Sequence, residues 1–341
     1  HSLQAFSPEY FKPGGKLFSY SKENFAAACS RYEHEDIPGF ISDKLPDPAR
    51  EWRHLDIKDF SAFFSNPAKF LLEKRLGIYL PDTADVLDER ENFSVGPLEK
   101  YVLDQEMVLH RLSGSDLKDF FPVKKAAGQL PHGNVGEFVY NEMSLDAQEF
   151  VRKIEHRMTG RRLEDQTVDL NVAGFTLCGR LTDIYEPGLI QIRYVKTKPK
   201  YLLNTWVNHV IHCELIEGKS SVKSLLLCKD AAWEFAPVSN VTNILNDLLE
   251  LFWKGMSEPL HFFPESSFEY ARRLLLKHHS KPEALNGAKN KWTGNDFVRG
   301  ESQDPYLERC FDKTDPLDHE FEKISEQIFA PLLDHCREII L

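Results

Sequence analysis

The sequence predicts an α/β domain in which a mixed central sheet is flanked by helices. β-Branched and aromatic residues nearly alternate in three successive runs separated by Ala-Gly and Pro-Gly steps, a pattern typical of antiparallel strands joined by tight turns. After Pro199 the period changes, and apolar residues recur every three or four positions from Tyr201 to Cys213, which predicts a helix. The three predicted strands are Thr167–Val172, Phe175–Tyr185 and Leu189–Lys196.

Further helices and strands are predicted on both sides of these three strands. Helical periodicity precedes them at Leu55–Phe64 (capped by Asp56), Lys69–Leu76, Leu98–Ser113, Leu117–Ala127 and, as one or two helices, Asn134–Met158. After them, strands are predicted at Ser221–Cys228 and Ala232–Ala236, and helices at Tyr201–Cys213, Val238–Met256, Ser267–Lys277 and Pro316–Cys336. Residues 280–304 show no usable periodicity, and the acidic residues 81–97 are expected to form an exposed loop.

The third predicted strand does not carry the pattern of a common metal site. Some nucleases hold a metal with an acid at the end of a second strand and an acid and a lysine two residues apart on the third, because alternate residues share a face. Here one face carries Gln191, Arg193 and Val195, and no carboxylate stands two residues before a lysine in either register. Mg²⁺ and Mn²⁺ prefer oxygen ligands, so an arginine at a ligand position repels them.

Length and composition indicate a globular protein with an ample core. The chain has 341 residues, of which 42% are hydrophobic and 28% charged. No run approaches the roughly 20 apolar residues of a membrane span, and no signal peptide is evident. Because the chain begins with His1, we expect a fragment of a longer protein.

Cysteines and histidines do not form a recognisable metal-binding pattern. The six cysteines include no CxxC pair, and Cys178, Cys213 and Cys228 are expected to be buried thiols in a reducing cytoplasm. His209 and His212 are three residues apart on a predicted helix, a spacing that suits a metal but also a pair in the core or at its edge. Because no third ligand is visible, we favour the core pair.

The net charge of -11 argues against a free-standing protein that wraps nucleic acid. A domain that meets DNA inside a larger assembly remains compatible with it. Lys196, Lys198 and Lys200 follow the third predicted strand, and two interpretations stay open: a solvated turn, or a rim along which single-stranded DNA passes.

Several stretches resemble the C-terminal domain of RecC, the gamma chain of exodeoxyribonuclease V. They are Leu130–Glu137 (LPHGNVGE), Gly179–Tyr185 (GRLTDIY), the helix holding Trp206, Leu17–Phe25, Phe63–Phe70, Leu98–Gln105, Phe262–Ser267 and Asp315–Asp318, and they span nearly the whole chain. The resemblance implies a restriction-endonuclease-like fold of the PD-(D/E)xK type, related to the RecB nuclease domain. Residues 56–341 would form this domain, with its core at about 130–256, and residues 1–55 would lead in from a preceding helicase-like part.

The resemblance also implies that the catalytic residues have been lost. Glu137 falls where active relatives have a histidine or acid on the first helix. Thr182 and Arg193 fall where these relatives have the acids of the second and third strands. Val195 replaces their lysine, and Trp206 replaces their glutamine. Asp183 comes one position late and so points to the opposite face. Asn66 replaces the cysteine that cluster-bearing relatives place before a proline, so neither an iron-sulfur cluster nor another cofactor is expected.

Two functions follow from the resemblance. The first is a non-catalytic module of the bacterial cytoplasm that docks RecB-like and RecD-like subunits and guides DNA strands separated at a duplex junction, in double-strand-break repair by homologous recombination. The second is a working metal nuclease with displaced ligands Glu137, Asp183 and Lys196. We favour the first.

The retained acid suggests one structural hypothesis. If Arg193 fills the former metal position, its guanidinium should pair with Glu137 within about 4 Å, because a buried charge needs a partner. The competing interpretation is that Glu137 is an ordinary carboxylate in the first turn of a helix.

Overall fold

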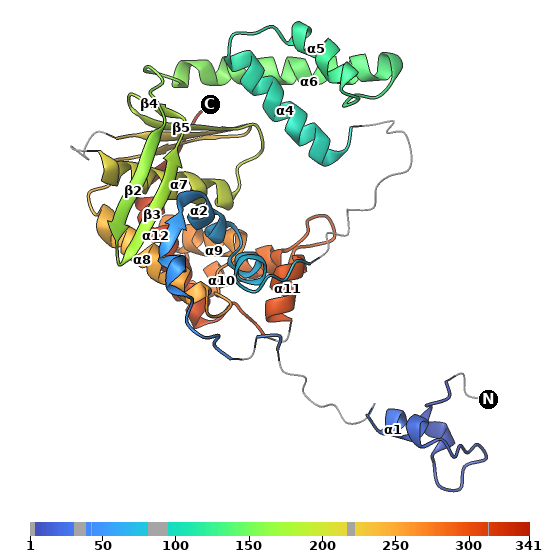
Figure 1. Ribbon diagram of the computed structural model, residues 1–341. Helices are drawn as coiled ribbons and strands as arrows, with labels where there is room; N and C mark the ends of the chain where they lie inside the picture. The colour runs from blue at the N-terminus through green and yellow to red at the C-terminus, as the bar shows by residue number, and fades with distance from the viewer. Residues whose placement is uncertain (1–3, 31–38, 42, 81–94, 217–221, 313) are drawn as a thin grey trace. The chain divides into compact units, whose positions relative to one another are not determined.

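The computed structural model describes residues 4–30, 39–41, 43–80, 95–216, 222–312 and 314–341 (Figure 1). The chain divides into two compact units, His1–Ser42 and Asp43–Leu341. The first contains a short 3-10 helix, η1 (Pro8–Tyr10), and the helix α1 (Lys22–Ser30). Most of the predicted acidic loop at 81–97 lies outside the described residues.

The second unit contains two sheets and is of the mixed α/β class, as predicted. The smaller sheet has the order β1 (His54–Asp56), β3 (Phe175–Leu181), β2 (Gln166–Val172), with β1 parallel and β2 antiparallel to β3. The larger has the order β4 (Ile184–Tyr185), β5 (Gly188–Arg193), β6 (Ser224–Cys228), β7 (Ala232–Phe235), β8 (Cys336–Ile339). In it β5 and β6 are parallel and the other neighbouring pairs are antiparallel.

The prediction of one continuous meander is wrong, because the second predicted strand breaks at Asp183. This residue has φ 57°, in the left-handed region that ends a strand and that aspartate tolerates better than most residues. The chain before the break pairs in the smaller sheet and the chain after it pairs in the larger one. The third strand also ends early, at Arg193, whose carbonyl oxygen accepts a hydrogen bond from the Val195 N–H at 2.7 Å. Val195 and Lys196 therefore lie beyond the strand.

Helices surround the two sheets largely where periodicity predicts them. They are α2 (Ile57–Ser65), α3 (Pro67–Phe70), α4 (Pro97–Leu112), α5 (Leu117–Ala126), α6 (Gly133–Ile154), α7 (Pro199–Leu215), α8 (Val241–Gly255), α9 (Pro264–Ala271), α10 (Lys281–Thr293), α11 (Pro305–Phe311) and α12 (His319–His335). Short helical turns are η2 (Arg50–Arg53), η3 (Leu71–Arg75), η4 (Glu155–Arg157), η6 (Arg272–Leu276) and η7 (Glu301–Gln303). The predicted cap of α2 is confirmed, since Asp56 Oδ1 accepts from the Lys58 N–H at 2.7 Å. None of the described helices is long and apolar enough to cross a membrane.

Several elements were not predicted, among them α10, α11, β1 and β8. The helix α10 lies in the stretch without periodicity, because its buried face consists of the small residues Ala284, Gly287 and Ala288. Its start does carry a signal, a capping box formed by Ser280 and Glu283. The last helix was predicted to reach Cys336, but it stops at His335, and Cys336–Ile339 form β8, which pairs with β7.

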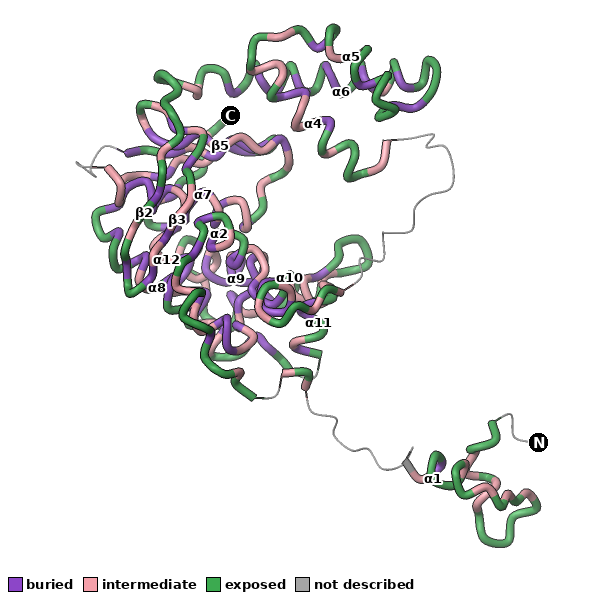
Figure 2. Tube along the Cα trace, viewed as in Figure 1, coloured by how far each residue is buried: buried purple, intermediate pink, exposed green. Residues whose placement is uncertain are grey.

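The larger sheet is buried on both faces, as expected for a sheet with helices on either side. On one face, Leu226 and Cys228 join a larger hydrophobic cluster with α2, α7, α8 and α12. On the other, Ile190 and Leu227 join a smaller cluster with α4 and α6. Figure 2 shows the buried positions running through α7 and α8. Among the predicted core thiols, Cys213 and Cys228 are buried, whereas Cys178 is only partly buried on β3.

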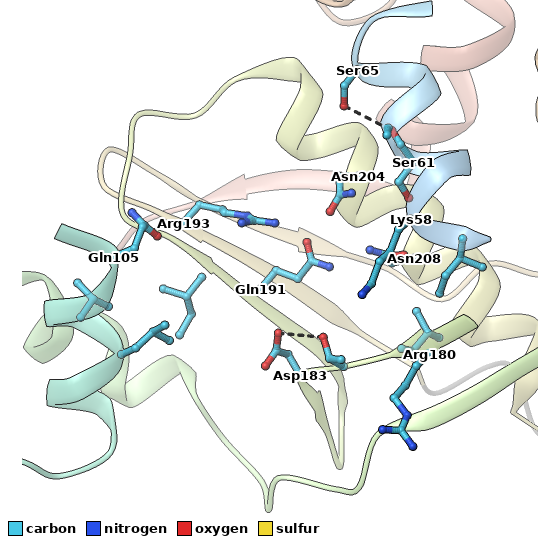
Figure 3. A pocket seen from close by; sticks show the side chains of 17 residues that line it. Lys58, Ser61, Ser65, Gln105, Arg180, Asp183, Gln191, Arg193, Asn204 and Asn208 are labelled. Atoms are coloured by element: carbon cyan, nitrogen blue, oxygen red, sulfur yellow. Dashed lines mark hydrogen bonds between the residues drawn. The ribbon is translucent and has the colours of Figure 1, made fainter. Parts of the chain in front are cut away.

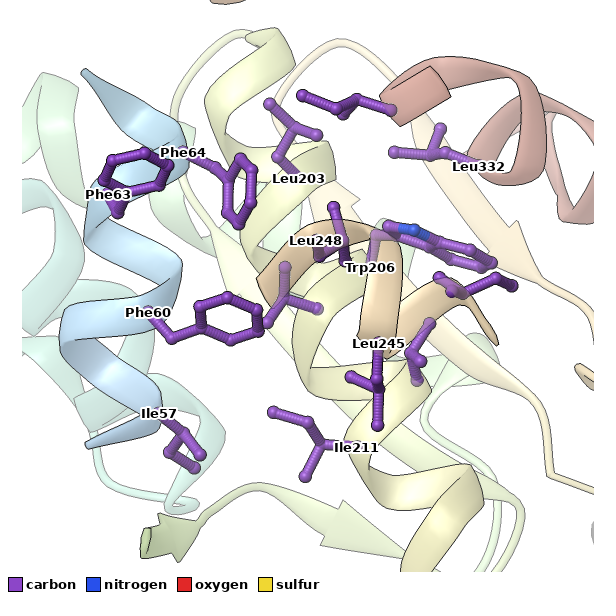
Figure 4. Packing of buried hydrophobic residues seen from close by; sticks show 14 of the residues in the cluster. Ile57, Phe60, Phe63, Phe64, Leu203, Trp206, Ile211, Leu245, Leu248 and Leu332 are labelled. Carbon is purple, nitrogen blue, oxygen red and sulfur yellow. The ribbon is translucent and has the colours of Figure 1, made fainter. Parts of the chain in front are cut away.

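The larger cluster ties α2 to the centre of the domain. Phe60, Phe63 and Phe64 of α2 are fully buried, and Phe60 points toward Leu248 and Ile211 (Figure 4). Full burial of one such ring contributes about 1.5–3 kcal/mol. This packing fixes α2, and with it Lys58, beside the strands of the site described next.

Candidate functional site

A cavity of about 620 Å³ lies between α2, α4, α7 and the ends of β3 and β5 (Figure 3). Gln191 and Arg193 of β5 line it together, because residues two apart on a strand share a face. This confirms the predicted face of the third strand for these two residues. From α7, Asn204 and Asn208 line it together, because residues four apart on a helix are neighbours.

Asp183 is the one carboxylate among the described residues that line the cavity. Its Oδ1 accepts a hydrogen bond from Arg162 Nη2 at 3.1 Å, and its Oδ2 accepts one from the Thr182 hydroxyl at 3.3 Å. Both charged side chains are largely exposed, so the ion pair contributes at most about 1 kcal/mol. The break in the strand thus leaves Thr182 and Asp183 at the cavity, with the acid already paired.

The cavity is rich in hydrogen-bond donors. Gln105 of α4 uses its Oε1 to accept the Tyr194 N–H at 3.2 Å, so its Nε2 points elsewhere; that atom is buried and has no partner among the described residues. Lys58 and Arg193 point into the cavity, whereas Arg180 points away at its edge. None of these three cations forms an ion pair with a described residue.

The expected ion pair between Arg193 and Glu137 is wrong. Glu137 is exposed on α6, lies outside the cavity lining and forms no ion pair within the described part of the chain. The reason is the pleat of β5. Arg193 faces the cavity, whereas its neighbour Tyr194 faces the smaller cluster, against which α6 packs from the opposite side of the sheet.

Trp206 and Val195 also lie away from the cavity. Trp206 is fully buried in the larger cluster, with its ring stacked on Phe235 at 6.4 Å and tilted against His335 at 5.8 Å. The residues of α7 that reach the cavity, Asn204 and Asn208, were missed by sequence reasoning. Two amides four residues apart on one helix were the available signal.

The alternative metal ligands are not gathered at the cavity. Of Glu137, Asp183 and Lys196, only Asp183 lines it; Lys196 is exposed beyond the end of β5. Within the described ranges, no group of three or more histidine, cysteine, aspartate or glutamate side chains is arranged to hold a metal ion. The described residues of the cavity therefore do not supply the several oxygen ligands that a divalent cation needs.

Lys198 and Lys200 line a second cavity, of about 540 Å³, without Lys196. Desolvation by burial lowers the pKa of Lys200, and the nearby charge of Lys198 adds to the effect. Opposite them, burial raises the pKa of Glu301 to about 7. The Glu301 carboxylate accepts hydrogen bonds from the backbone N–H groups of Glu265 and Ser266, at 2.9 and 2.8 Å, and so caps α9.

The predicted core pair of histidines is confirmed. His209 and His212 are buried, and desolvation lowers the pKa of each to about 4. His209 Nε2 lies 3.0 Å from the Ala236 carbonyl oxygen and therefore donates to it, which leaves Nδ1 to accept from the Ser224 hydroxyl at 2.8 Å. Its two ring nitrogens are thus engaged inside the protein.

The fold and the cavity define a mixed α/β domain with a donor-rich polar site at the ends of two strands. Comparison with known protein families places it more narrowly. The RecC C-terminal domain model matches residues 52–275, well over half of the chain, so the chain belongs to the RecC C-terminal domain family.

Three relatives show the extent of this similarity. The RecBCD enzyme subunit RecC of Escherichia coli K12 is 25% identical over 96% of this chain. The same subunit of Buchnera aphidicola subsp. Schizaphis graminum is 23% identical over 83%, and that of Haemophilus influenzae is 22% identical over 70%. The matched regions make up 29%, 27% and 21% of these relatives, so the chain spans less than a third of their length.

Proposed function

We propose that this chain is a non-catalytic, nuclease-like domain of a bacterial, cytoplasmic helicase and nuclease complex of the exodeoxyribonuclease V class. In this proposal it docks RecB-like and RecD-like subunits and guides DNA strands from a duplex junction during double-strand-break repair by homologous recombination. The relatives, named as RecC subunits of the RecBCD enzyme, support the assignment to such a complex.

A restriction-endonuclease-like fold of the PD-(D/E)xK type is part of the proposal. The order of β3, β5, α7 and β6, with β5 and β6 parallel, supports it. So does the cavity at the ends of β3 and β5, where such nucleases hold their metal. Residues 56–341 would then be the nuclease-like domain, with its core at about 130–256, and residues 1–55 the lead-in from a helicase-like part.

The observation that carries the non-catalytic assignment is the pair Thr182 and Arg193 in one cavity. At both of these positions we place the acids of the active relatives, while Val195 and Trp206 stand at the other lost positions and Glu137 stands at the position that keeps an acid. A divalent cation needs several oxygen ligands, but the described lining offers one carboxylate, already paired with Arg162. The Arg193 guanidinium would repel the ion. No cofactor is proposed.

Contact with DNA must be local in a chain of net charge -11. Lys196, Lys198 and Lys200 remain candidate DNA-binding residues. Lys198 and Lys200 share the second cavity with Lys69 and Arg299, but Glu265, Glu301 and Asp304 line it as well, so positive charge is not concentrated there.

The test is nuclease activity of the purified chain on linear duplex and single-stranded DNA with Mg²⁺, Mn²⁺ or Ca²⁺. We expect no degradation, because the cavity lacks a ligand set. Asp183→Asn is the matched variant, since it removes the one carboxylate of the lining. Metal-dependent degradation that disappears in Asp183→Asn would refute the non-catalytic assignment. Co-purification of the chain with RecB-type and RecD-type subunits tests the docking role separately.

A further inference from the structure

The cavity at the ends of β3 and β5 has the features of a binding site for an anion that only accepts hydrogen bonds. Two cationic side chains, Lys58 from α2 and Arg193 from β5, point into it from different elements (Figure 3). Neither forms an ion pair with a described residue. An anion in the cavity would therefore be attracted to two cations that are not already held in ion pairs with described residues.

Neutral donors surround the two cations. The amides of Gln191, Asn204 and Asn208 lie along the same wall. The carboxylate of Asp183 is occupied by Arg162 and Thr182. The cavity therefore offers donors in excess of acceptors.

We propose that this cavity binds a phosphodiester group of single-stranded DNA through Lys58 and Arg193, without a metal ion. The proposal rests on the proposed function and deepens it by naming a ligand for the former metal site. A phosphodiester carries one negative charge and only accepts hydrogen bonds, which matches the lining. Arg193 supplies the positive charge that a metal ion would otherwise bring to the phosphate.

The shape of the cavity favours a single strand over a duplex. Its volume of about 620 Å³ lies in the usual range of small-ligand sites, so it admits a nucleotide unit but not a rigid double helix. None of the described residues that line it is aromatic, so the bases gain no stacking there. The contact is with the backbone, and the binding is independent of sequence.

Fluorescence anisotropy of a labelled oligothymidylate, titrated with the chain in EDTA at several salt concentrations, tests this inference. We expect Lys58→Ala and Arg193→Ala each to weaken binding and to make the slope of log K against log salt less negative by about 0.7, the value for one lost phosphate contact with a single strand. Arg193→Lys should keep the slope, because it keeps the charge.

Matched controls separate the cavity from general charge effects. Arg152→Ala on α6 and Lys118→Ala on α5 remove exposed cations outside the cavity and should leave both affinity and slope unchanged. Inorganic phosphate and thymidine monophosphate serve as competitors. If phosphate or thymidine monophosphate displaces the oligonucleotide only at concentrations far above that of the oligonucleotide, the result supports a site for a DNA strand. Tight binding of these small anions by a chain that does not bind the oligonucleotide would overturn the inference.

Three further results would overturn the inference. The first is that Lys58→Ala and Arg193→Ala both leave oligonucleotide binding unchanged. The second is that binding is lost only when Lys198 and Lys200 are replaced. The third is that EDTA abolishes binding. In the first two cases the chain still contacts DNA, so the proposed function survives. In contrast, metal-dependent nuclease activity or a lack of binding to the partner subunits would refute the proposed function. Neither result depends on Lys58 or Arg193.

Discussion

Asp183 shows at the residue scale how one backbone angle shapes the site. Its φ of 57° ends β3, sends the chain into the larger sheet and leaves the Thr182 hydroxyl and the Asp183 carboxylate at the cavity. A strand predicted from alternation alone passes straight through this position. An aspartate within the pattern is compatible with either a strand or a left-handed break, so residue type did not decide between them.

The buried histidines predict a loss of stability in mild acid. Burial lowers the pKa of His209 and of His212 from 6.5 to about 4, so the unfolded chain takes up protons before the folded one does. The stability they contribute is complete above pH 6.5 and is lost as pH falls from 6.5 toward 4. The full effect is on the order of 3 kcal/mol for each histidine.

His212→Leu tests this dependence, because His212 Nδ1 has no hydrogen-bond partner in the described part of the chain and its loss leaves no acceptor unpaired. The free energy of unfolding, measured by urea titration between pH 7 and pH 4.5, should fall less steeply in the variant. About half of the decrease caused by the two histidines should disappear, because one of the two has been removed. An unchanged slope would show that His212 does not titrate with unfolding.

At the element scale, α8 packs so closely against α2 that replacing Gly255 by alanine is expected to destabilise the protein. A Cβ at Gly255 would lie 2.5 Å from the Phe63 Cζ, inside a cluster of fully buried rings. Alanine normally stabilises a helix by about 1 kcal/mol relative to glycine, but overpacking a core costs about 1–3 kcal/mol. We expect Gly255→Ala to be destabilising in urea unfolding, by up to about 2 kcal/mol, because the overpacking cost exceeds the helix gain.

A double-mutant cycle identifies the cause. Phe63→Leu removes the ring that the new methyl group meets, so Gly255→Ala should cost less in the Phe63→Leu background than in the unaltered chain. Equal costs in the two backgrounds would place the strain elsewhere.

Elements with large apolar faces were the ones that the sequence predicted well. The helices α2, α4, α7 and α8 carry such faces, and their predicted ranges agree closely with the observed ones. By contrast, α10 packs through Ala284, Gly287 and Ala288, whose small side chains produce little periodicity. The strand β8 exists because β7 offers an edge to pair with, a tertiary contact that no local pattern reports.

The candidate site was predictable in part for the same reason. Alternation along β5 placed Gln191 and Arg193 on one face, and both line the cavity. The pairing of Arg193 with Glu137 required knowing on which side of the sheet α6 packs. That depends on how the two hydrophobic clusters divide the faces of the sheet, which the strand pattern does not contain.

At the scale of the whole molecule, an acidic chain keeps a cationic cavity at the ends of two strands. The net charge of -11 disfavours general attraction to DNA, so affinity has to come from a few placed groups and to fall with salt. Lys58, Arg193 and the amides of the cavity are such groups. In our proposal these groups bind a DNA strand on a nuclease-like scaffold that lacks metal ligands.

The most direct test of this account is Mn²⁺ binding measured by calorimetry in the unaltered chain and in the double variant Thr182→Asp/Arg193→Asp. If these two positions are those of the lost acids, the double variant gains two carboxylates in one cavity and should bind Mn²⁺ saturably, while the unaltered chain does not. Circular dichroism confirms that the variant is folded. Saturable binding by the unaltered chain that Asp183→Asn abolishes, or a folded double variant that binds no Mn²⁺, would contradict the account.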